Sequence, residues 1–206
     1  MGSERLIIFL KAPRPGCVKT RLARELGAVP ACEAYQQMVD CLLANLATLP
    51  QVELCLTPDD AAEEIAKWAR PGWRMRPQGN GDLGLRLVRA FDRSFSEGAA
   101  RVLIIGSDCP TITVEDIHAG WDSLKQNEVV LGPAADGGYW LIGLRKRQPF
   151  LFENVAWSTS TVLTATLRKM EKAGLRTHLL RTRRDIDSRA DWEAFLKDPV
   201  TFGQTG

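Results

Sequence analysis

The chain of 206 residues has the length of one domain, and its hydrophobic share of 45% is ordinary for a protein with a packed core. Its 27 lysines and arginines nearly balance 25 acidic residues, which argues against a general affinity for nucleic acid or anionic membranes, so any anion site must be local. Five cysteines without CxxC spacing indicate neither a disulfide framework nor a zinc site, and no segment has the length of a membrane span. We therefore expect a cytoplasmic protein without a nucleic-acid partner.

The apolar runs that predict β-strands are short, rich in β-branched residues and bounded by turn residues. In chain order they are RLIIFL at 5–10, VELCLT at 52–57, RVLIIG at 101–106, EVVLGP at 128–133 and YWLIGL at 139–144. A further strand is expected in HLLRTRRDID at 178–187. Their continuous apolar character is typical of strands that are covered on both faces.

Helical periodicity fills the segments between these strands. The predicted helices cover 18–26, 31–49, 60–69, 83–95, 114–126 and 162–173, with a last helix starting at Arg189. Strands that alternate with helices predict an α/β fold, a mostly parallel open sheet with helices on both faces. The hairpin-like ADGGY at 135–139 predicts one antiparallel element. We expect a single domain over residues 1–206, with residues 200–206 as a loose tail.

Cations crowd the Pro/Gly loop that follows the first strand, and they repel one another unless solvent or an anion lies among them. The free N–H groups at the start of the next helix favour an anion, whereas Lys19 and Arg21 oppose the helix dipole. Val18 stands where a Walker A loop needs glycine, so this is not a P-loop. Phosphate binding is our prediction, and a solvated basic turn is the alternative. The predicted phosphate-binding residues are Lys11, Arg14, Gly16, Lys19 and Arg21.

Asp108 follows the predicted strand at 101–106, at the edge where open parallel sheets bind ligands. The next helix does not need it as a cap, because Thr113 and Asp116 match the capping-box pattern. A carboxylate that faces phosphates repels them unless a cation intervenes, and Mg²⁺ typically takes one or two carboxylates plus substrate phosphates. We therefore predict that Asp108 is a metal ligand.

Asp185 and Asp187 are two residues apart on an extended segment, so both side chains project to the same side. Ser188 with Asp191 can cap the last helix, which leaves these two carboxylates without a capping role. Ion pairs with neighbouring arginines are the alternative explanation. Taken with Asp108, they predict a second metal ligand, either Asp185 or Asp187.

The segment QGNGDLG at 78–84 contains the G-x-G-x-x-G pattern of dinucleotide-binding folds. A charged segment precedes it and Asp82 would put a carboxylate in the pyrophosphate cradle, so an NAD-binding oxidoreductase is only an alternative. As a glycine-rich turn into a helix, the segment can instead approach a flat base. The residues predicted for this role are Gln78, Gly79, Gly81 and Asp82.

Asp136 is the one general-base candidate that the sequence offers near the predicted cleft. His118 lies in a helical pattern and His178 in a strand, and both are better explained as structural. Tyr139, Trp140 and Trp157 could form a stacking surface, although buried aromatic residues more often belong to the core.

The motifs in order are KAPRPGCVKTRL, QGNGDLGLRL, GSDCPT, LGPAADGGYWLIGL, WST and DID. From Leu6 to about Trp192 they resemble a bacterial family of uncharacterised, glycosyltransferase-like proteins in the nucleotide-diphospho-sugar transferase superfamily, which has the GT-A fold. The chain is similar also to phospholactate and molybdenum-cofactor guanylyltransferases. The resemblance implies that the first loop holds nucleotide phosphates, that residues 78–84 lie by the base, and that Asp108 binds a divalent metal with a carboxylate of DID. Leu85 stands where glutamate is expected, which leaves no acidic role there.

We therefore expect a transferase that uses Mg²⁺ or Mn²⁺ and a nucleoside triphosphate or nucleotide sugar, with a small-molecule acceptor. Asp108, Asp136 and Lys19 are the expected catalytic residues. Nucleotidyl transfer to a phosphorylated acceptor needs no general base, whereas glycosyl transfer to a hydroxyl usually does, so the sequence leaves both open. A non-catalytic nucleotide-binding module is the remaining alternative.

Overall fold

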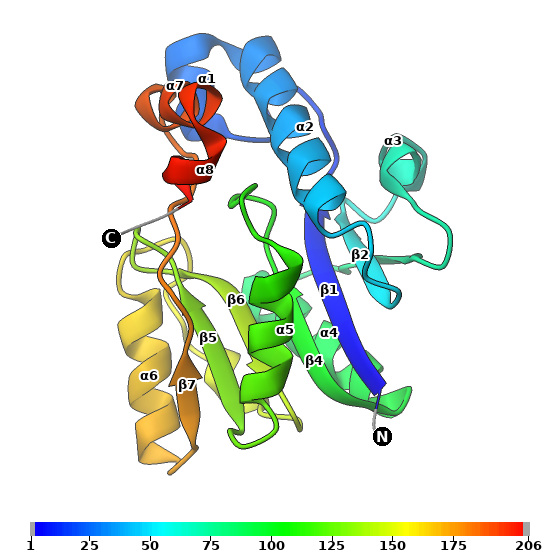
Figure 1. The fold of residues 1–206 in the computed structure, drawn as a ribbon, viewed down its shortest axis with the longest axis vertical. Coiled ribbons are helices and arrows are strands. Elements are labelled where there is room, and N and C mark those ends of the chain that lie inside the picture. Colours follow the sequence, from blue (N-terminus) through cyan, green and yellow to red (C-terminus); the bar gives the residue numbers. More distant parts are fainter. Residues whose placement is uncertain (1–2, 204–206) are drawn as a thin grey trace.

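A computed structural model of the protein describes residues 3–203, and a single seven-stranded sheet organises them in the order β3-β2-β1-β4-β6-β5-β7 (Figure 1). The strands are β1 Ser3–Lys11, β2 Val52–Thr57, β3 Arg74–Pro77, β4 Ala99–Ile105, β5 Val129–Pro133, β6 Tyr139–Leu144 and β7 Thr177–Leu179. β6 runs antiparallel to β4 and β5, and the other pairs are parallel. The predicted open, mostly parallel sheet with one antiparallel element is confirmed.

Helices cover both faces of this sheet. They are α1 Thr20–Leu26, α2 Ala28–Asn45, α3 Ala62–Ile65, α4 Leu83–Ser96, α5 Val114–Ser123, α6 Val162–Lys172, α7 Arg189–Lys197 and α8 Pro199–Phe202, with 3₁₀ turns at Ala66–Trp68 and Pro149–Phe152. Alternate residues of β1 point to opposite faces. Leu6 and Ile8 join the core formed with α2 and α5, whereas Ile7 joins the core formed with α4 and α6.

The sequence did not predict the edge strand β3. Its residues Arg74–Pro77 are mostly exposed and carry two arginines, since an edge strand pairs on one side and needs no continuous apolar run. The predicted strand at 178–187 forms a ladder only at Thr177–Leu179. Its remainder is extended chain that returns to the sheet at Arg183 and then to the loop after β4, where the Ile186 N–H donates to the Asp108 carbonyl at 3.1 Å.

The prediction that residues 200–206 form a loose tail is wrong for its first part. Asp198 caps the short helix α8, and Phe202 is buried against Phe195, with ring centroids 6.0 Å apart. A four-residue helix has too little periodicity to be recognised in a sequence, and burial of one aromatic ring stabilises it. Residues 204–206 lie outside the described part of the chain.

Both predicted capping boxes are confirmed. Thr113 and Asp116 bond reciprocally at the start of α5, and Ser188 and Asp191 do so at the start of α7. Asp108 is therefore free of a capping duty, as the sequence indicated. Within residues 3–203 the longest helices are too short or too polar to pass through a bilayer.

Candidate functional site

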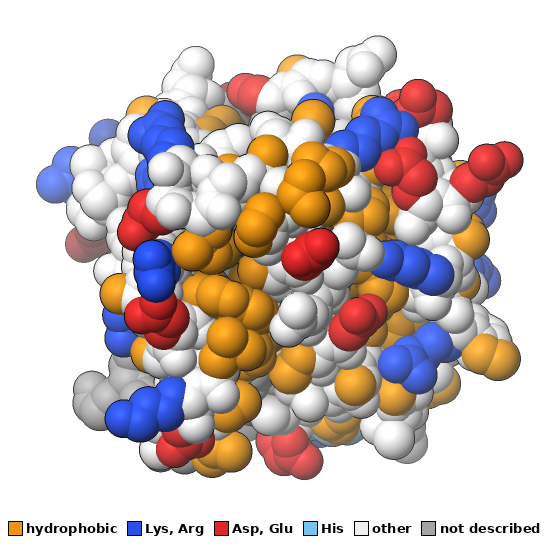
Figure 2. Space-filling view, turned by 90° about the horizontal axis from the view of Figure 1, so that it is seen from above, with side chains coloured by type: hydrophobic (Ala, Val, Ile, Leu, Met, Phe, Trp, Pro, Cys, Tyr) orange, Lys and Arg blue, Asp and Glu red, His pale blue; other side chains and the backbone are white. Residues whose placement is uncertain are grey.

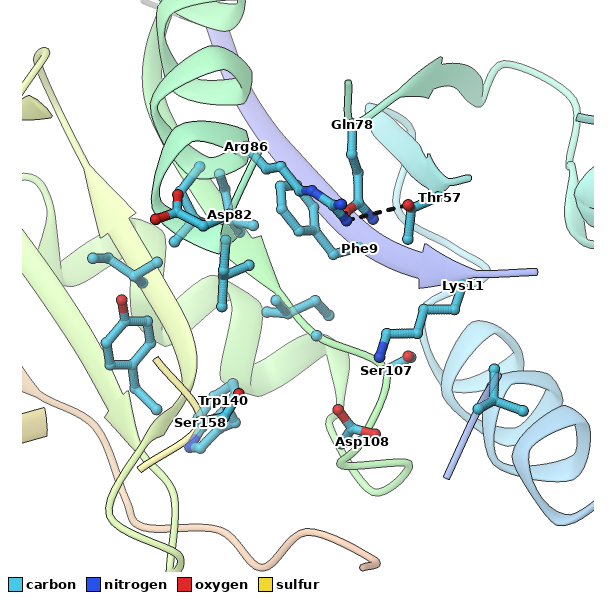
Figure 3. Close-up of a pocket in the computed structure, with 18 of the residues that line it drawn as sticks. Phe9, Lys11, Thr57, Gln78, Asp82, Arg86, Ser107, Asp108, Trp140 and Ser158 are labelled. Atoms are coloured by element: carbon cyan, nitrogen blue, oxygen red, sulfur yellow. Dashed lines mark hydrogen bonds between the residues drawn. The ribbon is translucent and has the colours of Figure 1, made fainter. Parts of the chain in front are cut away.

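A cavity of about 520 Å³ opens at the carboxyl ends of the parallel strands (Figure 3). Its wall takes residues from the ends of β1, β2 and β4 and from the position after β3, and the start of β6 joins them because that strand runs the opposite way. Residues from these ends and the start of α4 include Lys11, Thr57, Gln78, Asp108, Tyr139 and Asp82. Figure 2 looks onto this end of the molecule, where a band of hydrophobic side chains is flanked by acidic and basic groups. Such an edge is where open α/β sheets bind ligands.

Lys19 stands at the centre of the charged side of the cavity, just before α1. Its side chain is 3% exposed, and its ammonium lies 2.5 Å from Asp108 Oδ1 and 3.6 Å from Asp187 Oδ1. It also donates to the Ile186 carbonyl at 2.6 Å. Burial alone would lower the pKa of Lys19, but these carboxylates more than offset it and raise the pKa above its ordinary value. Lys19 is therefore a buried, charged lysine that ties α1 to two distant acidic segments.

The backbone at Lys19 is left-handed, with φ 47° and ψ 48°. A non-glycine residue in this region costs on the order of 1 kcal/mol or more, and it persists where surrounding contacts require it. The bonds to Asp108 and Ile186 supply that requirement. Strain of this kind clusters at functional sites, so it supports the assignment of this end of the molecule.

Three predicted metal-binding carboxylates converge here with different partners. Asp108 is half-exposed; partial burial would raise its pKa, but the Lys19 ammonium outweighs this effect and lowers it. Asp187 also pairs with Arg21, at 3.1 Å. Asp185 accepts a hydrogen bond from the Cys109 thiol at 2.9 Å, and burial raises the pKa of Asp185 to about 7. Asp108 and Asp187 thus share one cation, whereas Asp185 turns to a thiol.

Among the described residues, no three His, Cys, Asp or Glu side chains already form a metal-binding group. A pair of carboxylates does gather around one ammonium, and carboxylate oxygens are the donors that Mg²⁺ and Mn²⁺ prefer. The donor set of Asp108 and Asp187 therefore fits a divalent cation that completes its coordination with ligand phosphates and water.

The predicted phosphate-binding residues divide into two groups. Lys11 and Lys19 line the cavity, whereas Arg21 is exposed beside Asp187 at its rim. Arg14 is drawn away from the cavity by α3: its guanidinium contacts Glu64 at 2.5 Å and Asp60 at 3.3 Å. Gly16 has φ +81° with open space around the position of a side chain, which suits a loop that receives a ligand.

The glycine-rich segment turns into α4 at the opposite wall. Gly79 and Gly81 have φ +77° and +107°, and Asp82 caps the helix by accepting from the Leu85 N–H at 2.9 Å. Gly81 and Asp82 line the cavity, but Gly79 packs against Arg89 instead. The segment follows the edge strand β3, whereas a dinucleotide-binding fingerprint follows a central strand, so the topology gives the NAD alternative no support.

Gln78 occupies a buried position between the first three strands. It is 4% exposed and donates its amide hydrogens to the carbonyls of Leu10 and Cys55, at 3.2 and 2.8 Å. Its Oε1 accepts from Arg86, at 3.2 Å. Gln78 therefore joins β1, β2 and α4 at the cavity wall, which is a structural role that the sequence did not indicate.

The sequence analysis missed Arg86 and Tyr35, which also line the cavity. Arg86 lies one helical turn after Asp82, so the i, i+4 spacing could have placed it over the glycine-rich turn. The hydroxyl of Tyr35 on α2 accepts from the Lys11 N–H at 2.9 Å and lies 3.3 Å from Ser107 Oγ. It holds together the carboxyl ends of β1 and β4, and no local pattern in α2 distinguishes it from a core residue.

The predicted base and stacking residues have mixed positions. The Asp136 side chain is exposed and accepts a hydrogen bond from the N–H of Gly138, two residues on in the same turn, at 2.8 Å. Asp136 is not among the residues that line the cavity. Tyr139 and Trp140 do line the cavity, whereas Trp157 packs against Gly84 of α4. Neither His118 nor His178 lies in the described cavity wall.

This sheet order and the position of the cavity define the nucleotide-diphospho-sugar transferase fold. A structure from Desulfovibrio desulfuricans G20, whose name assigns it provisionally to these transferases, is 30% identical with a TM-score of 0.86, covering 98% of this chain and 97% of that one. A family model described as uncharacterised protein conserved in bacteria (DUF2064) matches residues 42–159. The chain belongs to this family.

Two more distant structures show the same fold. CMP:2-keto-3-deoxy-manno-octonic acid synthetase complexed with CTP is 10% identical, with a TM-score of 0.59 over 97% of this chain and 99% of that one. The Rv0371C protein of Mycobacterium tuberculosis H37Rv in complex with manganese is 14% identical, with a TM-score of 0.52 over 95% and 99% of the two chains. None of the curated proteins matches this chain.

Proposed function

We propose that this protein is a divalent-metal-dependent transferase that uses a nucleotide donor, and that it transfers a nucleotidyl group to a phosphorylated acceptor. The observation that carries this proposal is the Lys19 ammonium, buried between Asp108 and Asp187 at the mouth of the cavity. Carboxylates interleaved with lysines suit a ligand that brings both a cation and phosphates. The CTP and manganese complexes of the two distant structures are consistent with such a ligand.

Asp108 and Asp187 are the proposed metal ligands. Asp185 is assigned a positioning role, because it accepts a hydrogen bond from the thiol of Cys109, the residue after Asp108. The lowered pKa of Asp108 keeps its carboxylate charged at neutral pH. A bound Mg²⁺ or Mn²⁺ would neutralise phosphate charge and orient the donor. Asp187 is preferred over Asp185 because it shares the Lys19 ammonium with Asp108.

Lys11 and Lys19 are the proposed phosphate-binding residues inside the cavity, with Arg21 at the rim. Both lysines belong to the segment that leaves β1 and enters α1, and Gly16 between them leaves room for a ligand. As the negative charge on the transferred phosphate spreads in the transition state, fixed ammonium groups stabilise it without reorganisation. This role makes Lys19 and Asp108 the central catalytic candidates.

Each carboxylate of the described cavity wall has another role, since Asp82 caps α4 and Asp108 is a proposed metal ligand, and this favours nucleotidyl transfer. Neither histidine lines the cavity, and Asp136 bonds to its own turn. A phosphorylated acceptor is already anionic, so its oxygen can form the bond to the α-phosphorus directly. The bond from the α-phosphorus to the bridging oxygen then breaks, and pyrophosphate leaves with that electron pair.

Glycosyl transfer is the second candidate, and the name of the Desulfovibrio structure favours it. A hydroxyl acceptor would need a base, and Asp136 is the carboxylate nearest to that requirement. It lies in the turn before Tyr139, whose side chain lines the cavity. Asp136 would then have to release the Gly138 N–H and turn toward the acceptor.

The first experiment measures thermal unfolding with nucleoside triphosphates, nucleotide sugars and NAD, each with and without Mg²⁺ or Mn²⁺. A ligand at a hundred times its Kd stabilises the folded state by about 2.7 kcal/mol, which is easily measured. A metal-dependent shift that is lost in Asp108→Asn supports the proposal. Stabilisation by NAD alone, or by no nucleotide, contradicts it.

Product analysis then separates the candidates. With a panel of sugar phosphates and other phosphorylated acceptors, pyrophosphate release supports nucleotidyl transfer. Release of a nucleoside diphosphate from a nucleotide sugar supports glycosyl transfer, and Asp136→Asn should then abolish it. Tight, metal-dependent binding without either product indicates a nucleotide-binding module without catalysis.

A further inference from the structure

Arg86 is a cation in the cavity wall whose partners among residues 3–203 include no carboxylate. Its Nε donates to the Gly81 carbonyl at 2.9 Å, and its Nη1 donates to Thr57 Oγ1 at 3.1 Å and to Gln78 Oε1 at 3.2 Å. These three bonds fix the guanidinium plane between the end of β2 and the start of α4. Within the described chain, both hydrogens of Nη2 are left without an acceptor. Arginine has five such hydrogens in a rigid fork, so these two are available to a ligand.

The neighbouring Gln78 amide has one possible orientation. Its nitrogen faces two main-chain carbonyls, Leu10 and Cys55, which only accept hydrogen bonds. The oxygen must therefore be the atom that faces Arg86, and a carbonyl oxygen has two lone pairs, of which Arg86 uses one. Gln78 Oε1 is thus a fixed acceptor beside a fixed donor.

Apolar side chains line the same cavity as this polar pair. Phe9 lines the same cavity as Arg86, Gln78 and Thr57, and Figure 3 draws the four side chains on one side of it. Leu87 and Ile104 extend the apolar wall. Lys11, Ser107 and Asp108 group at a separate side of the cavity in the same view. Lys11 offers a phosphate its cation on that separate side, whereas a planar heterocycle with a polar edge suits a wall that combines apolar side chains with Arg86 and Gln78.

We propose that this cavity selects a donor whose base carries a keto group next to a ring N–H, as in guanine, hypoxanthine and uracil. This inference rests on the proposed use of a nucleotide donor. The carbonyl oxygen of such a base accepts from Arg86 Nη2, and the adjacent ring N–H donates to Gln78 Oε1. In adenine and cytosine the order is reversed: an amino group would face the Arg86 hydrogens, and a bare ring nitrogen would face the Gln78 oxygen.

Discrimination should be large because both protein groups are already fixed. A mismatched base leaves buried donors and acceptors unpaired, which costs more than a missing contact on an open surface. Rotating Gln78 would break its bonds to Leu10 and Cys55. We therefore expect the keto bases to bind about tenfold or more tightly than their amino counterparts.

The test uses the intact chain and two matched pairs of nucleotides with Mg²⁺, measured by calorimetry. ITP and ATP differ only at the purine edge, and UTP and CTP differ only at the pyrimidine edge. Tighter binding of ITP over ATP and of UTP over CTP supports the inference. Equal affinities within both pairs, or a preference for the amino bases, overturns it while the proposed function stands. Failure of all four nucleotides to bind overturns both.

Arg86→Gln identifies the residue responsible, since a glutamine amide can present either a donor or an acceptor. The ratio of ITP to ATP affinity should fall toward one, while metal-dependent binding of the phosphates persists. Arg168→Gln on the exposed side of α6 is the matched control and should keep the ratio of the unsubstituted protein. An undiminished ratio in Arg86→Gln would assign the selection to another group. If Arg86→Gln does not fold, the nucleotide pairs on the intact chain still decide the question.

Discussion

The Lys19 ammonium lies 2.5 Å from Asp108 Oδ1, and the two residues are held together from different parts of the chain. Lys19 comes from the loop after β1, and Asp108 from the loop after β4, the neighbouring parallel strand. The third member, Asp187, arrives by the long return of the chain from β7. The pair is therefore both a structural link across the sheet edge and the centre of the proposed site.

We predict that Asp108→Asn weakens both metal-dependent ligand binding and stability. The substitution leaves the buried Lys19 ammonium with Asp187 at 3.6 Å and the Ile186 carbonyl. Loss of one charged partner of a buried group should cost on the order of 1–3 kcal/mol of unfolding free energy. Urea unfolding and metal-dependent thermal shifts measure the two effects. Asp122→Asn, in an exposed ion pair with Lys125, is the control and should change neither by a comparable amount.

We predict that the acidic residues at α3 and the nucleotide phosphates compete for the Arg14 guanidinium. Its guanidinium is bound to Glu64 and Asp60 outside the cavity, although it lies in the predicted phosphate-binding loop. If it can turn inward, Glu64→Gln should release it and increase nucleotide affinity several-fold, more so at low salt. Arg14→Ala should remove that gain in the double variant. Unchanged affinity in Glu64→Gln would limit Arg14 to a structural link with α3.

Stability should depend on Asp191 in acid solution. Its carboxylate accepts from the Ser188 hydroxyl at 2.6 Å and the Ser188 N–H at 3.0 Å. Burial would raise its pKa, but the Ser188 bonds and Arg184 more than offset this and lower it. A carboxyl whose pKa is lower in the folded than in the unfolded state adds to the free energy of unfolding at pH values above its unfolded pKa, which is near 4. This contribution is lost as the pH falls through the pKa of the folded state.

Asp191→Asn should therefore destabilise the protein by about 0.5–2 kcal/mol at neutral pH, and the difference should shrink toward pH 3. Denaturant unfolding at a series of pH values measures this. Glu193→Gln on the same helix belongs to an exposed ion pair with Arg189 and serves as the control. An equal loss at pH 3 and pH 7 would show that Asp191 acts through packing rather than charge.

Gly84 is expected to be required for packing rather than for ligand contact. A Cβ there would lie 2.6 Å from the Phe152 carbonyl and 3.1 Å from Trp157 Nε1. Gly84→Ala should cost about 1–3 kcal/mol, although alanine usually favours helices, because backbone cannot move aside cheaply. Thermal unfolding measures it, with the exposed Leu85→Ala as the control on the same helix. A stabilised Gly84→Ala variant would contradict the close packing.

Much of the fold could be predicted because local patterns carry it. The strands VELCLT and YWLIGL were predicted with their observed bounds, since buried strands read as continuous apolar runs. Both capping boxes follow from two residues three positions apart. The edge strand β3 escaped prediction because its pairing with β2, and no apolar run of its own, makes it a strand.

The candidate site was predictable in its residue types but not in its partners. Asp108, Lys19 and Asp187 stood out as charges at strand ends, and the topology does bring them together. Their mutual bonds, the diversion of Arg14 to Glu64 and the structural use of Gln78 depend on groups tens of residues away. The spacing from Asp82 could have placed Arg86 over the glycine-rich turn, but its bonds to Thr57 and Gln78 form only in the folded chain.

By itself, the sequence determined the alternation of strands and helices, the helix caps and the gathering of charge at the strand ends, because these depend on neighbours within a few residues. Only the tertiary structure decided which charges meet. Lys19 could have faced solvent, and its burial between Asp108 and Asp187 requires β1 and β4 to lie side by side and the chain after β7 to return across them. Hydrogen bonds and ion pairs act over a few ångströms, so their partners follow from the path of the chain through space and not from its order.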